Sequence, residues 1–121
     1  MKLAEILKPD FIFEDHRGTL TQITHEPFAQ TNAVFTRAGE VRGDFHYHRF
    51  SKEIFFIISG EIKLHLKKDD LSEAAVFRSG DMFLIPENVK HRFEFLKDTY
   101  LVAFYTNRVE LENGEKDIIS D

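Results

Sequence analysis

Hydrophobic and polar residues alternate with a period of two along most of the chain. The clearest example is EIKLHLK at residues 61–67, where isoleucine and leucine at even positions alternate with charged residues and histidine at odd positions. This alternation is typical of a β-strand with one buried face. We expect strands at residues 19–23, 33–36, 53–59, 61–67, 75–78, 81–85, 92–96 and 100–106.

Glycine, proline, asparagine and aspartate separate these segments, and no long amphipathic helix is available to cover a parallel sheet. Many short strands at this spacing predict an all-β fold, an antiparallel sandwich or barrel. At most a short N-terminal helix is expected, at residues 3–8 and ended by Pro9. We also expect a tight hairpin at ISGE (58–61) and a solvent-exposed loop at KKDDLSE (67–73).

The composition indicates one globular domain over residues 1–121, with 42% hydrophobic and 31% charged residues. The 13 phenylalanines favour a β-rich interior. A net charge of −5 argues against a nucleic-acid partner, which needs clustered lysine and arginine. Cysteine is absent, which excludes disulfides and thiolate chemistry, and no apolar run approaches the ~20 residues of a membrane span. We therefore expect a cytoplasmic protein without a membrane partner.

The candidate chemistry begins with two histidines, His46 and His48, that lie one residue apart. Side chains at positions i and i+2 of a strand point to the same side, so the two imidazoles converge. Glu53 follows at the head of an apolar run whose two faces are equally hydrophobic. A carboxylate in that place is costly unless it is paired or bound to a metal ion.

A third histidine, His91, shares the parity of the apolar residues Phe93 and Phe95, so we expect it to face the interior. Three imidazoles and the carboxylate of Glu53 could bind a divalent ion such as Zn, Fe, Mn, Ni or Cu. For each histidine alone, a hydrogen-bonded residue of the core remains the alternative. The same parity predicts a mostly apolar cavity lined by Phe35, Phe55, Ile57, Phe83, Phe93 and Phe104.

The spacing of these residues resembles the two signatures of the cupin superfamily. The first signature is matched by His46, His48, Glu53 and Gly60, and the second by Gly80, Pro86 and His91. The resemblance implies a jelly-roll barrel, an antiparallel double sheet, with His46, His48, Glu53 and His91 as metal ligands. Two residues depart from the second signature, Asn88 in place of glycine and Phe95 in place of asparagine. Asparagine tolerates the left-handed conformation that glycine would supply.

Two further segments resemble cupins that act on nucleotide-linked sugars. FEDHRGTL (13–20) is similar to their F-x-D-x-R-G-x-L opening, and AGEVRGDFHYH (38–48) to their G-x-x-R-G-x-H-x-H segment, with one extra residue before the histidines. In the 3,4-ketoisomerases of that branch the histidine pair is the catalytic acid/base, whereas in the cupin domain of capsular-polysaccharide epimerase/reductases the full ligand set holds a metal. The resemblance implies catalytic roles for His46, His48 and Arg42.

A neutral imidazole that binds a metal cannot also accept a substrate proton, so the two readings of the histidine pair exclude each other. The complete set of four ligands favours a metal. The function we predict is that of an enzyme, an isomerase or epimerase of a dTDP- or UDP-linked keto-sugar in polysaccharide or deoxysugar biosynthesis. A non-catalytic binding protein, accessory or sensor, and an Fe(II) dioxygenase are the alternatives. Open sheet edges predict a homodimer.

Overall fold

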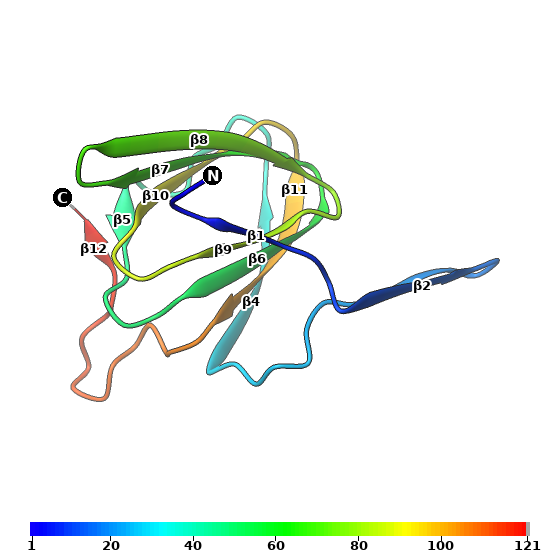
Figure 1. The fold of residues 1–121 in the computed structure, drawn as a ribbon, viewed down its shortest axis with the longest axis horizontal. Helices are drawn as coiled ribbons and strands as arrows, with labels where there is room; N and C mark the ends of the chain where they lie inside the picture. Colours follow the sequence, from blue (N-terminus) through cyan, green and yellow to red (C-terminus); the bar gives the residue numbers. More distant parts are fainter. Residues whose placement is uncertain (121) are drawn as a thin grey trace.

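The computed structural model describes residues 1–120 as two five-stranded antiparallel sheets and one separate hairpin. The first sheet has the order β1 (Glu5–Leu7), β9 (Met82–Ile85), β6 (Glu53–Ser59), β11 (Thr99–Tyr105) and β4 (Gln30–Thr36). The second has the order β12 (Ile119–Ser120), β5 (His46–Tyr47), β10 (Lys90–Phe95), β7 (Glu61–Lys68) and β8 (Leu71–Arg78). The sheets face each other in a curved, barrel-like body (Figure 1). The predicted all-β antiparallel fold is confirmed.

The alternating residues form the core between the sheets. Ile62, Leu64 and Leu66 of β7 are fully or almost fully buried, while the residues between them reach the outer face. They belong to one cluster with Phe55 of β6, Phe83 of β9, and Phe93 and Phe95 of β10. Full burial of each aliphatic side chain contributes about 1.5–3 kcal/mol, so this cluster is the main stabilising element of the fold.

The N-terminal segment differs from the prediction. Residues 5–7 form β1, an edge strand paired with β9, instead of a helical turn. The predicted loop at 67–73 is also wrong, because β7 and β8 pair up to Lys68 and Leu71 and only Asp69 and Asp70 form the turn. No membrane-spanning helix occurs in the part of the chain that the structure describes.

The ISGE segment is a crossing between the sheets and not a hairpin. β6 lies in the first sheet and β7 in the second, and Gly60 joins them with a φ of 110°. A Cβ atom at Gly60 would lie 2.3 Å from Oγ1 of Thr99 and 2.5 Å from the carbonyl oxygen of Asp98. Only glycine fits this corner, for both conformational and steric reasons.

The hairpin of β2 (Phe11–Asp15) and β3 (Gly18–Gln22) projects away from the body of the two sheets (Figure 1). Arg17 closes its turn, because its backbone and guanidinium both donate to the Asp15 carboxylate. Phe13 and Leu20 face each other across the pair, and both are more than half exposed. A solvated hairpin with exposed apolar residues is marginal by itself.

Candidate metal centre

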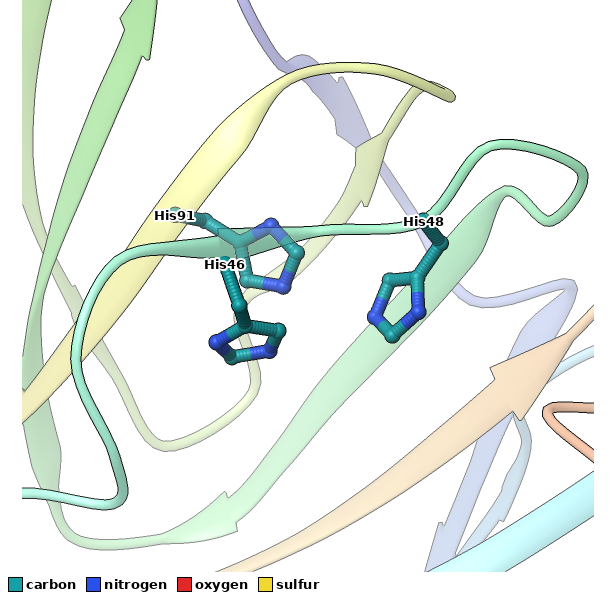
Figure 2. A group of neighbouring side chains, drawn as sticks. All are labelled: His46, His48 and His91. Carbon is teal, nitrogen blue, oxygen red and sulfur yellow. The ribbon is translucent and has the colours of Figure 1, made fainter. Parts of the chain in front are cut away.

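Two neighbouring strands bring the three histidines together. His46 on β5 is the registered partner of His91 on β10, and His48 follows β5 by one residue. One ring nitrogen of each histidine lies within 4.8 Å of a ring nitrogen of the other two. Figure 2 shows the three imidazoles converging from these two segments. The predicted parities hold, since the neighbours of His91 within β10 lie partly exposed while His91 is buried.

Backbone carbonyls fix the orientation of all three rings. His46 and His91 place Nδ1 3.1 and 3.0 Å from the carbonyl oxygen two residues earlier in the chain, and His48 places Nδ1 2.5 Å from that of Asp117. A carbonyl oxygen only accepts hydrogen bonds, so each Nδ1 carries the proton. When each ring is neutral, Nε2 therefore keeps its lone pair, which is the tautomer that a metal ligand needs.

Glu53, the first residue of β6, places a buried carboxylate beside His48 and His91. Its Oε1 lies 2.5 Å from Nε2 of His48 and 3.3 Å from Nε2 of His91, and its side chain is 4% exposed. Within residues 1–120, neither Nε2 of His48 nor Oε1 of Glu53 has a hydrogen-bond partner of acceptable geometry. Two adjacent buried polar atoms without an aligned hydrogen bond are costly unless a further group joins them.

The charges of these groups respond to burial and to one another. Burial raises the pKa of Glu53, but the contacts with His48 and His91 outweigh burial and bring the pKa to about 2. Burial lowers the pKa of His48, whereas the Glu53 carboxylate and Asp117 together raise it more, so the net pKa is above its usual value. The pKa of His46 is lowered, first by burial and then by the neighbouring His91. His46 is therefore neutral at physiological pH.

The donor set fits a divalent metal ion. Three neutral imidazole nitrogens and one carboxylate oxygen suit Zn, Fe, Mn, Ni or Cu, and imidazole held through the opposite ring nitrogen is a stronger and better oriented ligand. An ion at this point would also satisfy the unpartnered atoms of His48 and Glu53. The arrangement thus combines the ligands and the supporting hydrogen bonds of a metal site.

A cavity of about 160 Å³ opens beside this cluster. Its apolar wall includes Phe55 and Phe93, as predicted, and its polar wall consists of Arg42, His46, Glu53, His91 and Tyr105. The wall also contains Phe95, Val34, Leu101 and Ala103, which the sequence interpretation did not name as lining residues.

Four of the predicted lining residues lie elsewhere. Ile57 and Phe83 are fully buried in the core below the cavity. Phe35 is on the opposite face of β4, against Tyr100, and Phe104 contacts Phe28. The parity of β4 and β11 was assigned wrongly, because alternation between two apolar sets does not show which set faces inwards.

Family comparison agrees with this geometry. The profile of the Cupin domain family matches residues 34–106, which is more than half of the chain and contains all four residues of the cluster. The chain belongs to the cupin family. The sequence resemblance is thereby confirmed at the level of the family and its fold.

Solved structures with the same fold as this cupin include sugar-nucleotide enzymes. The 3,4-ketoisomerase QdtA of Thermoanaerobacterium thermosaccharolyticum, in complex with TDP, has a TM-score of 0.82 at 16% identity, over 100% of this chain and 90% of that chain. The dTDP-4-dehydrorhamnose 3,5-epimerase of Sulfolobus tokodaii has a TM-score of 0.76 at 24% identity, over 99% of this chain and 78% of that chain. At these identities the likeness shows the fold.

The curated relatives match a smaller part of this chain than the solved structures do. The uncharacterised protein YdbB of Bacillus subtilis is 40% identical over 60 residues, 50% of this chain and 47% of YdbB, so the match spans about half the length of that relative. A pyrimidine/purine nucleoside phosphorylase of Pseudomonas savastanoi pv. phaseolicola is 28% identical over 88 residues, 73% of this chain and 89% of that protein.

Arg42 lies at the wall of this cupin's cavity, where its Nε donates to Oγ1 of Thr36 at 2.7 Å and its Nη2 to the carbonyl oxygen of Phe35 at 2.9 Å. A guanidinium has five N–H donors, so these two bonds orient it and leave three for an anion. The predicted left-handed Asn88 is confirmed, with a φ of 64° in the turn before β10.

The sequence interpretation missed two residues near the site. Tyr105 lies in the wall of the cavity, 6.2 Å from His48 between ring centroids. Burial and then the Glu53 charge raise its pKa to about 12, so the phenol stays protonated at neutral pH. Asp117 carried no signal at all, since a single aspartate near the C-terminus follows no recognisable spacing.

Proposed function

We propose that His46, His48, Glu53 and His91 bind a divalent metal ion. The observation that carries this proposal is the backbone carbonyl oxygen next to Nδ1 of each of the three imidazoles, an arrangement that leaves Nε2 available as a ligand. The buried and unpartnered atoms of His48 and Glu53 support it. A metal in this place would act as a Lewis acid that polarises a substrate carbonyl.

We further propose that the protein is an isomerase or epimerase of a nucleotide-linked keto-sugar. The cavity of about 160 Å³ has room for a sugar ring but not for a nucleotide. A second concavity of about 460 Å³, lined by residues 35–37 and 40–42, has Arg42 in common with it. The sugar would enter the cavity while the diphosphate and base remain outside. The fold shared with sugar-nucleotide ketoisomerases and epimerases supports this substrate class.

The residues of the cavity suit proton transfer next to a keto group. Arg42 would bind the diphosphate with the N–H groups that Thr36 and Phe35 leave free. Tyr105, whose phenol keeps its proton, would donate it to the oxygen that gains charge when a neighbouring C–H is broken. Without a metal, His46 is the neutral base that faces the cavity, because its pKa is lowered.

Solvent exchange tests the activity. The protein is incubated in deuterated water with dTDP- or UDP-linked 4-keto-6-deoxyhexoses, and products are followed by NMR and mass spectrometry. We expect deuterium at the carbon next to the keto group. Arg42→Ala should raise KM at least tenfold by removing an anion contact, whereas Arg92→Ala, on the outer face of β10, should leave KM unchanged. Binding without any exchange would contradict the enzymatic function and favour an accessory or sensor protein.

We also propose that the protein forms a homodimer through the β2–β3 hairpin. The hairpin has exposed apolar residues, and the first sheet ends in the open edge of β4 and has exposed Phe35, Ile58 and Tyr100 on its outer side. If two copies related by a twofold axis exchanged their hairpins, each hairpin would pack on the first sheet of the other copy. The apolar residues of the hairpin and those of the sheet would then both be covered.

A further inference from the structure

β5, the strand that contains His46 and leads into His48, depends on the C-terminal segment. β5 has one registered pair with β10, His91 with His46, and two with β12, Ile119 with Tyr47 and Ser120 with His46. We call residues 107–120, which lead to and include β12, the strap. Because β5 is only two residues long, the strap supplies most of its pairing. The position of the histidine pair is therefore set by a segment about 70 residues further along the chain.

Asp117 is the centre of the contact between strap and site. Its side chain is fully buried, its Oδ1 accepts from the backbone N–H of Arg49 at 2.8 Å, and its Oδ2 accepts from that of Phe50 at 2.9 Å. Its carbonyl oxygen accepts from Nδ1 of His48, and its own N–H donates to Val109 within the strap. One residue thus fixes the His48 ring and the two residues that follow it.

We propose that Asp117 is a positioning residue of the histidine cluster. The Asp117 carboxylate accepts hydrogen bonds from the backbone of residues 49 and 50, and this places the Asp117 carbonyl against His48. The carbonyl keeps Nδ1 protonated and turns Nε2 toward Glu53. Loss of the carboxylate would release the strap, and with it the tautomer and direction of His48. The part of this inference that concerns metal affinity depends on the proposed metal site.

Cobalt titration and histidine NMR test the role of Asp117. Metal-free protein is titrated with Co²⁺, followed by visible absorbance and calorimetry, in the wild type, Asp117→Ala, Asp117→Asn and Glu112→Gln. Glu112 is an exposed carboxylate of the same strap and provides the matched control. We expect Asp117→Ala to weaken Co²⁺ binding about 10- to 100-fold, the usual effect of removing support behind a ligand. Asp117→Asn, which keeps one acceptor oxygen, should be intermediate, and Glu112→Gln should match the wild type.

The ring tautomer in the metal-free protein gives a second readout, which a general loss of stability in a folded variant would not change. At a pH above the raised pKa of His48, where the ring is neutral, nitrogen-15 spectra should show His48 protonated at Nδ1 in the wild type and as a mixture of tautomers in Asp117→Ala. Circular dichroism shows whether each variant folds. If Asp117→Ala does not fold, the milder Asp117→Asn variant tests the role of Asp117. A wild type that binds no Co²⁺ would overturn the metal proposal, while the tautomer would still test Asp117. Unchanged affinity and an unchanged tautomer in both Asp117 variants would overturn this inference.

Discussion

Glu53 shows how one buried charge organises the site. An isolated carboxylate at this depth would take up a proton, yet the two histidines beside it bring its pKa to about 2. The sequence predicted this convergence, because strand parity and family spacing both place the four side chains on one interior point. It could not predict the carbonyl behind the His48 ring, because Asp117 lies 69 residues from His48.

Replacing Glu53 tests this charge balance in the metal-free protein. A carboxylate with a lowered pKa stabilises the fold above its unfolded pKa of about 4.5, and this stabilisation is lost as the pH falls toward 2. His48, whose pKa is raised, contributes below about 6.5, and this contribution is lost as the pH rises through its folded pKa. We expect Glu53→Gln to reduce the free energy of unfolding between these limits by about 1–3 kcal/mol.

Urea unfolding from pH 2 to 9 measures this effect. The difference between the wild type and Glu53→Gln should be largest between pH 4.5 and 6.5 and should shrink toward both ends of the range. Glu112→Gln, which removes an exposed carboxylate, should follow the wild type throughout. A constant difference across the whole range would show that Glu53 does not interact with the histidines as described.

At the scale of elements, the sequence predicted best the strands that bury one face. β6 begins and ends as expected, and β7 differs by one residue, because their apolar residues recur at the strand period. β1 was missed because an exposed edge strand owes its structure to pairing with β9 and has no buried face of its own. The crossing at Gly60 looked like a hairpin because a single glycine serves both kinds of turn.

The β2–β3 hairpin gives the prediction that belongs to this scale. If hairpins are exchanged in a dimer, Phe13→Ser combined with Leu20→Ser should increase the dimer dissociation constant at least 100-fold, because two apolar side chains leave the interface. Leu71→Ser, a partly exposed residue on β8, serves as the control and should leave the dimer intact. Sedimentation equilibrium measures both, and a wild type that is monomeric at high micromolar concentration would refute the exchange.

For the whole molecule, the cupin fold places distant segments around one point. His46 comes from β5 and His48 from the residue that follows it, His91 comes from the neighbouring strand β10, and Glu53 comes from the other sheet. The support of the His48 ring comes from the strap. The sandwich therefore forms the site only when both sheets and the C-terminal segment are in place. The fold class and the meeting of the three histidines followed from the sequence, whereas the size and walls of the cavity required the three-dimensional packing of side chains.

The central claim is that this point binds a divalent metal ion, and metal content tests it most directly. The wild type and His48→Ala are purified without chelators and analysed by inductively coupled plasma mass spectrometry. We predict about one divalent ion per chain in the wild type, as expected for a single closed ligand set, and almost none in the variant. A folded wild type without metal that also takes up none of Zn, Fe, Mn, Ni or Cu, or a variant that retains the ion in full, would contradict the account.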